Sequence, residues 1–192
     1  MAKSNDSERT NLIICIILAC SNQFCGINAI VFYAKQLFMR ITDNNNNLSQ
    51  ISIILFGVVQ ILATLIGGKL MDKHSKKKFL FGGEVAMVVI LACIFFFNSN
   101  TPVVVTLIFM HSIAYSFSIG QLLLFYAAKM LDSTGYVVMV NWFATFLVAL
   151  SAEFMMKWLG IGKMCLVFCV ILSTCLVILG KSLPSDQELL DK

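Results

Sequence analysis

Six long apolar stretches, separated by short polar breaks, constrain this chain more than any other feature of its sequence. They cover residues 12–38, 51–71, 79–97, 103–128, 136–156 and 161–180. A helix that crosses the hydrocarbon core of a membrane needs about 20 apolar residues. None of the stretches shows the strict alternation of a barrel strand. We therefore predict an all-α, polytopic membrane protein with six transmembrane helices.

The composition agrees with a chain that is almost entirely membrane domain. Of its 192 residues, 59% are hydrophobic and 12% are charged, whereas soluble domains average about 45–50% apolar and about 25% charged residues. This excludes a large soluble domain, a disordered chain and a nucleic-acid binder. We divide the chain into a polar N-terminal tail (1–11), a six-helix membrane domain (12–180) and a polar C-terminal tail (181–192).

The positive charges predict the orientation in the membrane. Six crossings put both termini on one side, together with the second and fourth loops. That side carries ten basic residues, and the other side carries four, namely Lys35, Arg40, Lys157 and Lys163. Because basic loops stay on the cytoplasmic side, we expect both termini in the cytoplasm or in an organelle matrix. The plasma membrane and the mitochondrial inner membrane both remain open.

Cysteine and histidine usage argues against metal sites and catalysis. All seven cysteines lie in the apolar stretches, and none forms a CxxC pair with histidines nearby. We interpret them as small hydrophobic residues of a helix bundle. His74 and His111 have no nucleophile or carboxylate at a useful spacing. We therefore expect no enzyme activity, no metal and no cofactor.

The first apolar stretch contains an unusual group of amides, Asn22, Gln23 and Asn28, with Gly26 between them. Residues five or six apart do not share one narrow face of a helix. A helix loosened near Gly26 would turn all three toward one aqueous pocket, as broken helices do in transporters. Alternatively, the amides form hydrogen bonds to neighbouring helices. The residues alone leave both interpretations open.

Five motifs, in order along the chain, resemble those of sugar porters of the major facilitator superfamily. They are Asn22–Asn28 with Phe32-Tyr33 (QQxxGIN…YY of helix seven), Gly57–Gln60 (GxxN of helix eight), Asp72–Lys77 (the D/E-R-x-G-R-R loop), Asn141–Phe146 (NWxxNF of helix eleven) and Leu183-Pro184 (PET). The chain thus resembles the carboxy-terminal six-helix half of a facilitative glucose transporter-like porter. This resemblance implies a fold with a three-plus-three helix repeat.

The resemblance also implies roles for individual residues. Gln23, Asn28 and Gln60 match amides that bind sugar hydroxyls, and the adjacent Asn22 is a further candidate. Amides suit this role because each offers both donors and acceptors. The basic loop, with Asp72, Lys73, Lys76 and Lys77, matches the family's cytoplasmic charge network.

Other positions depart from the family pattern. Residues 120–124 lack the prolines and the Trp of the helix-ten motif GPxPxPW, so the gate has lost the hinge residues of the family. The acidic sugar contact falls near Ser116, and the second Asn of NWxxNF is Thr145. Two hydroxyls without partners cost about 2–6 kcal/mol, and millimolar binding amounts to only about 4 kcal/mol.

These departures favour a degenerate accessory subunit packed in a larger membrane complex. The alternative is a hexose transporter that works as a homodimer or with a separate N-terminal half. Either function requires the lipid bilayer and a second protein or second copy that covers the inter-half face, and the alternative adds a hexose. We also expect Glu84 to lie near Lys77 or Lys78 and Glu153 to pair with Lys157.

Overall fold

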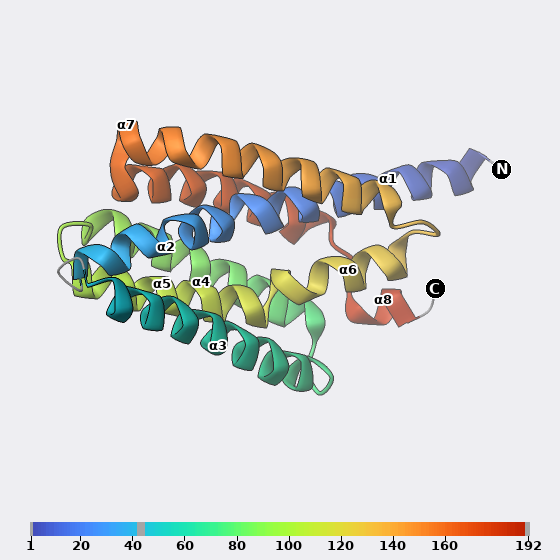
Figure 1. Cartoon of the computed structure of the whole chain (residues 1–192). Coiled ribbons are helices and arrows are strands. Elements are labelled where there is room, and N and C mark those ends of the chain that lie inside the picture. The colour runs from blue at the N-terminus through green and yellow to red at the C-terminus, as the bar shows by residue number, and fades with distance from the viewer. Residues whose placement is uncertain (1, 42–44, 191–192) are drawn as a thin grey trace.

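A computed structural model describes residues 2–41 and 45–190, and these residues form helices without any strand. Figure 1 shows the helices side by side in one bundle. They are α1 (Ala2–Phe24), α2 (Ile27–Ile41), α3 (Asn46–Met71), α4 (Lys76–Phe96), α5 (Thr101–Phe117), α6 (Ile119–Met130), α7 (Gly135–Ser182) and the short α8 (Asp186–Leu190). The prediction of an all-α fold is confirmed.

The number of membrane crossings depends on a reversal inside α7. Five segments of the described chain are long and apolar enough to span a membrane, and α7 is the longest, with 48 residues. As one straight rod α7 would be about 72 Å long, more than twice the thickness of a hydrocarbon core of about 30 Å. At Gly160, φ is 73° and ψ is 171°, and the two halves of α7 lie side by side in Figure 1. Two crossings by α7 bring the total to the predicted six.

Two of the predicted crossings are broken helices. The first stretch separates into α1 and α2 around Gly26, and the fourth into α5 and α6 at Ser118, where φ is −129° and ψ is −111°. The fourth crossing therefore breaks although it lacks the prolines of the family's hinge motif. Each group of three crossings therefore begins with a broken helix, as in a three-plus-three repeat.

The beginnings of several helices are explained by side chains that cap free backbone N–H groups. Asn45 accepts hydrogen bonds from the backbone of Asn47 and Leu48 at the start of α3. Ser75 and Asn100 accept hydrogen bonds in the same way at the starts of α4 and α5. The segment predicted as a polar N-terminal tail, residues 1–11, is helical from Ala2 onward, because α1 begins there and continues into the first crossing.

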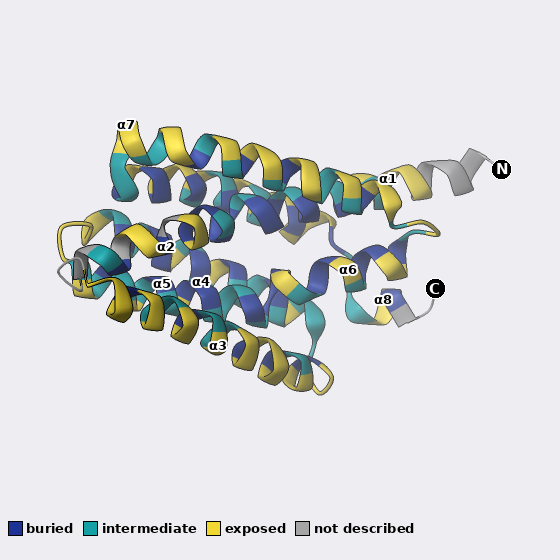
Figure 2. Cartoon of the chain, viewed as in Figure 1, coloured by how far each residue is buried: buried dark blue, intermediate teal, exposed yellow. Residues whose placement is uncertain are grey.

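The core lies around α1, which packs against α6 and α7. Leu18 and Ala19 of α1 and Met164 and Leu172 of α7 are fully buried. By contrast, α3 and the first half of α7 present many exposed apolar side chains, which Figure 2 shows in yellow. Exposed apolar faces of this kind are expected where helices contact lipid or another protein.

Both ends of the described chain lie at the same end of the bundle as the α3–α4 and α6–α7 connections (Figure 1). This arrangement agrees with an even number of crossings. Which side of the membrane this end faces remains a prediction from the charges. The side chains of Lys3, Arg40 and Lys192, which entered that charge count, lie outside the described part of the chain, as does that of Tyr33.

Candidate functional site

The break between α1 and α2 is built on Gly26, whose φ of 82° is rarely adopted by residues with a side chain. A Cβ atom at this position would also lie 2.8 Å from Cδ2 of Phe168 on α7. The backbone N–H of Gly26 donates to the carbonyl of Gln23, and its own carbonyl accepts from Ile30 at the start of α2. Glycine therefore permits both the turn and the close packing of α7 against it.

Four amide side chains meet beside this break, and we call them the amide cluster. Asn22 Nδ2 and Gln23 Nε2 both donate to Oδ1 of Asn141 on α7, at 2.9 Å and 2.8 Å. Asn28 Nδ2 donates to Gln23 Oε1 at 2.6 Å. The break thus brings together the three amides of the first stretch, and Asn141, more than 100 residues away, joins them.

The amide cluster lines a pocket of about 360 Å³. Asn22 and Gln23 are only 5% and 4% exposed, whereas Trp142, which lines the same pocket, is 67% exposed. Tyr115 of α5 and Thr145 of α7 contribute further to the lining. Oδ1 of Asn22 is buried and has no hydrogen-bond partner among the described residues. The pocket therefore combines polar amide groups with aromatic side chains.

Gln60, the fourth amide predicted for this site, is not part of the amide cluster. It lines a separate hollow on α3, together with Ile61, Thr64 and Leu65. In the described part of the chain the Gln60 side chain makes no hydrogen bond. Its backbone carbonyl accepts one from Thr64 Oγ1. Three of the four predicted residues are therefore brought together, and the fourth is not.

Gln121 stabilises the break between α5 and α6, a role that the motif comparison did not assign to it. Its Nε2 donates to the carbonyl of Ser116 at 2.7 Å and to the carbonyl of Thr64 on α3 at 2.8 Å. A break releases backbone carbonyls from the helix, and a carbonyl inside a membrane must find another donor. The Gln121 amide therefore donates to the carbonyl of Ser116 at this break and joins the break to α3 through the carbonyl of Thr64.

The basic loop contacts the C-terminal segment through hydrogen bonds. The backbone N–H of Lys77 donates to Asp186 Oδ1 at 3.2 Å, and Lys77 Nζ donates to the carbonyl of Leu183 at 2.5 Å. Lys76 Nζ lies 5.1 Å from the ring centre of Phe125. Asp72, Lys73 and Lys76 line a shallow pocket that also includes Asp186. Over residues 2–41 and 45–190, no ion pair joins these groups, nor is the expected Glu153–Lys157 pair formed.

Glu84 does not lie near Lys77 or Lys78, so that expectation is wrong. It is fully buried between helices, where Ser21 of α1 donates a hydrogen bond to its Oε1. Its Oε2 has no partner among the described residues. Glu84 is separated from the two lysines because it lies about two turns further along α4, on the side of the helix where it meets Ser21 of α1.

Comparison with known proteins identifies related transporters. The family model described as "Sugar (and other) transporter" matches residues 1–185. The arabinose-proton symporter of Bacillus subtilis (strain 168) is 23% identical over 190 residues, which are 94% of this chain and 41% of the symporter. The facilitated trehalose transporter Tret1-1 of Drosophila sechellia is 29% identical over 143 residues, covering 66% of this chain and 16% of that protein.

Among solved structures, the major facilitator superfamily proton:xylose symporter XylE, bound to 6-bromo-6-deoxy-D-glucose, has a similar fold. Its TM-score is 0.79 at 17% identity, over 90% of this chain and 39% of XylE. The chain thus spans less than half the length of each of these relatives. The relatives are transporters rather than enzymes, in agreement with the prediction from the sequence. The family match over residues 1–185 shows that the chain belongs to the sugar (and other) transporter family, with the fold of a six-helix half of a major facilitator protein.

Proposed function

We propose that this chain forms one wall of a sugar-binding site in a membrane transporter and that the amide cluster is the part that contacts the sugar. The observation that carries the proposal is the amide cluster itself, which is held in place by three hydrogen bonds beside a helix break. Broken helices form the substrate sites of many transporters. The names of the related proteins, which include arabinose and trehalose carriers, support a sugar as the substrate class.

The chemistry of the pocket suits a sugar. Each sugar hydroxyl donates and accepts hydrogen bonds, and an amide side chain offers both an acceptor and donors to it. Within the described residues, Asn141 Nδ2 and Asn28 Oδ1 form none of the hydrogen bonds of the amide cluster, so they are available to a ligand. Trp142 and Tyr115 offer flat apolar surfaces to the C–H face of a sugar ring. The pocket volume of about 360 Å³ also falls in the range of small-molecule sites, about 300–1,000 Å³.

The opposite wall of the site comes from a second six-helix half, in the same polypeptide or in a separate one. Transport in this type of fold requires two halves that rock around a site near the middle of the membrane. The large exposed fraction of Trp142 supports a covering partner on this face. We also propose that both termini and the basic loop face the cytoplasm or an organelle matrix, as the positive charges predict.

A second candidate function is that of an accessory subunit that packs this face against a larger membrane complex. One specific observation favours it, namely that many of the amide groups already bond within the chain. Asn141 Oδ1 accepts two hydrogen bonds, and Gln121 Nε2 is occupied by two backbone carbonyls. Gln60 also lies away from the amide cluster. Fewer amide groups are therefore available to a sugar than in a fully equipped site.

A binding experiment separates the two functions. In a Trp158→Phe variant, Trp142 is the one remaining tryptophan, and it lines the pocket. We expect D-glucose or D-xylose to change its fluorescence in a saturable way. Gln23→Ala should weaken this binding about tenfold, because Gln23 positions Asn28 and Asn141 through its two hydrogen bonds. One hydrogen bond to the sugar lost in this way is worth about 1.5 kcal/mol at the upper end of its range. Gln36→Ala, which changes an exposed amide of α2, is the matched control.

The accessory function predicts a different outcome. The fluorescence of Trp142 would not respond to either sugar, and the chain would migrate with a larger complex on a native gel. That combination would overturn the transporter proposal. A response to sugar that is insensitive to Gln23→Ala would place the binding site elsewhere.

A further inference from the structure

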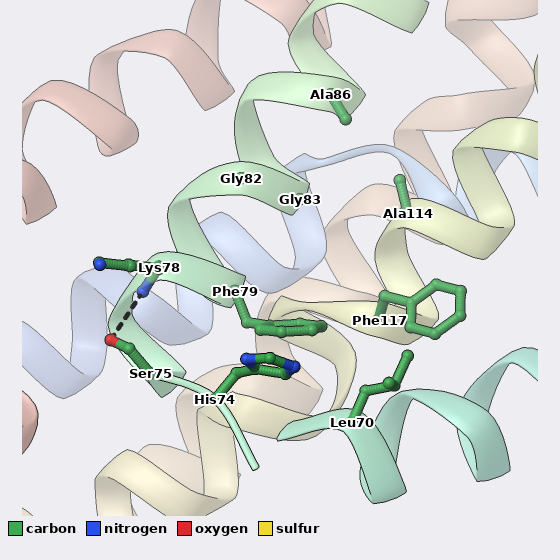
Figure 3. Close-up of a pocket in the computed structure, with 10 residues that line it drawn as sticks. All are labelled: Leu70, His74, Ser75, Lys78, Phe79, Gly82, Gly83, Ala86, Ala114 and Phe117. Carbon is green, nitrogen blue, oxygen red and sulfur yellow. Dashed lines mark hydrogen bonds between the residues drawn. The ribbon is translucent and has the colours of Figure 1, made fainter. Parts of the chain in front are cut away.

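A second hollow, of about 560 Å³, lies between α3, α4 and α5 at the end of the bundle that carries the basic loop (Figure 3). It shares no lining residue with the amide pocket. We call it the α4 groove. Gly83 lies at its base. A Cβ atom on Gly83 would overlap the side chain of Ser118 and lie 3.1 Å from the carbonyl oxygen of Ala114, so α4 is in close contact with the end of α5. Gly82, in contrast, faces open space, since an added Cβ would meet no atom within 4 Å.

The walls of the α4 groove are almost entirely hydrocarbon. Leu70 of α3, Phe79 of α4 and Phe117 of α5 surround it at one end, and Ala86 and Ala114 line it further along α4 (Figure 3). A sugar in this groove would leave its hydroxyls without partners, at a cost of about 1–3 kcal/mol each. An alkyl chain has no polar group to satisfy and gains from contact with these walls. The lining therefore favours an acyl chain.

The mouth of the α4 groove is positive. Ser75 caps α4 by accepting a hydrogen bond from the backbone N–H of Lys78, and Asp186 Oδ1 accepts one from the backbone N–H of Lys77. Ser75 and Lys78 line the mouth, with His74 stacked on the ring of Phe79. The neighbouring residues Lys69, Lys73, Lys76 and Lys77 outnumber the nearby carboxylates Asp72 and Asp186, so this end of the bundle carries a net positive charge. A basic segment beside a membrane attracts anionic lipids.

We propose that the α4 groove binds an anionic phospholipid, with one acyl chain between α3 and α4 and the phosphate beside the side chain of Lys78. The charge of the mouth and the hydrocarbon walls match the two parts of such a lipid. The acyl chain lies against α5 directly before the break at Ser118, because Ala114 and Phe117 form that wall. The proposal is independent of the proposed sugar site, since neither shares a residue with the other.

Lipid titrations of the purified chain in detergent, followed by native mass spectrometry, test this proposal. The probes are palmitoyl-oleoyl phosphatidylglycerol and palmitoyl-oleoyl phosphatidylcholine. We expect the anionic lipid to bind more tightly. Lys78→Gln should weaken binding of phosphatidylglycerol about fivefold, since a basic residue near the membrane surface contributes about 1 kcal/mol, and should leave phosphatidylcholine unaffected. Lys163→Gln, at a position predicted on the opposite side of the membrane, is the charge control.

A second variant tests the acyl-chain half of the proposal. Gly82→Leu extends a side chain into the α4 groove from a position where an added Cβ meets no atom within 4 Å, and it should weaken the binding of both lipids. Gly57→Leu, at another glycine of a spanning helix that faces open space, should leave both unchanged. Circular dichroism verifies that each variant retains its helices, and Lys78→Gln tests the proposal without altering a helix interior. Equal affinity for the two lipids, or binding insensitive to Gly82→Leu, would overturn the proposal. So would a dimer of the chain that Gly82→Leu dissociates, because a protein would then occupy the groove.

Discussion

The hydroxyl of Ser21 donates a hydrogen bond of 2.6 Å to Oε1 of Glu84, and this bond joins α1 to α4 across 63 residues of sequence. Glu84 is fully buried, with its second oxygen unpartnered among the described residues. Ser21 directly precedes Asn22 and Gln23 of the amide cluster. The bond therefore positions the half of the broken helix that presents the amides to the pocket.

We expect Ser21→Ala to destabilise the protein by about 1–3 kcal/mol, because it leaves a buried carboxyl group with no hydrogen-bond donor. Glu84→Gln should cost less, since the amide oxygen can still accept from Ser21. Thermal unfolding in detergent, followed by circular dichroism, measures both. The control is Ser173→Ala, whose hydroxyl donates to the carbonyl of Cys169, one turn earlier in its own helix. Equal losses for Ser21→Ala and Ser173→Ala would contradict the prediction.

Gly26→Ala should destabilise the protein by about 1–3 kcal/mol from backbone strain alone, because φ is positive at this position. The contact with Phe168 adds to this loss, so the double variant Gly26→Ala with Phe168→Ala should show less than the sum of the two single effects. Thermal unfolding again provides the measurement. Gly57→Ala, in open space within α3, should be neutral or stabilising by up to about 1 kcal/mol. Indistinguishable melting of Gly26→Ala and Gly57→Ala would refute the account of this break.

Gln121→Leu should loosen the break between α5 and α6, because the carbonyls of Ser116 and Thr64 both lose a donor. The two losses together correspond to about 1–3 kcal/mol if typical hydrogen bonds are lost. Hydrogen exchange should become faster in the first turn of α6, near Leu122. Gln50→Leu, which changes an exposed glutamine of α3, is the matched control. Unchanged exchange in Gln121→Leu would mean that packing alone maintains the break.

The two ends of α3 should lie on opposite sides of the membrane. A cysteine introduced at Ser75 is expected to react from the cytoplasmic or matrix side, and one at Asn46 from the other side. This follows from the ten-to-four distribution of basic residues and from the two ends of α3, which lie at opposite ends of the bundle in Figure 1. A membrane-impermeant thiol reagent applied to sealed vesicles makes the measurement, with the parent chain as the control for its seven native cysteines. Labelling of both positions from one side would refute this topology.

These 192 residues, expressed alone in a hexose-transport-deficient cell, should produce no measurable sugar uptake. The reason is that the amide pocket has one wall and no opposing half against which to rock. Uptake of radiolabelled glucose measures this, and a complete sugar porter expressed in the same cell is the positive control. Saturable uptake that disappears in Gln23→Ala would show instead that a second copy of the chain supplies the opposite wall.

Much of the architecture could be predicted because it depends on local properties of the chain. The length of an apolar stretch determines whether a helix can cross the membrane, since each residue adds about 1.5 Å. The amides around Gly26 left two interpretations open, a broken helix that turns them toward one pocket or hydrogen bonds to neighbouring helices, because their spacing is compatible with both. The length of an apolar stretch does not predict how two crossings are connected. Between the last two crossings the helix continues up to Gly160 without a loop, and the chain reverses at this single residue.

What the sequence by itself determined is therefore the number of crossings, the fold and the presence of three amides around Gly26. Only the tertiary structure decided which residues meet. Asn141 joins the amide cluster, Gln60 remains apart on α3, Glu84 bonds to Ser21 instead of a lysine, and Gln121 replaces prolines at the second break. The physical reason is that spacing along a helix specifies the face on which a side chain lies, whereas its partner depends on the packing of helices that are distant in sequence.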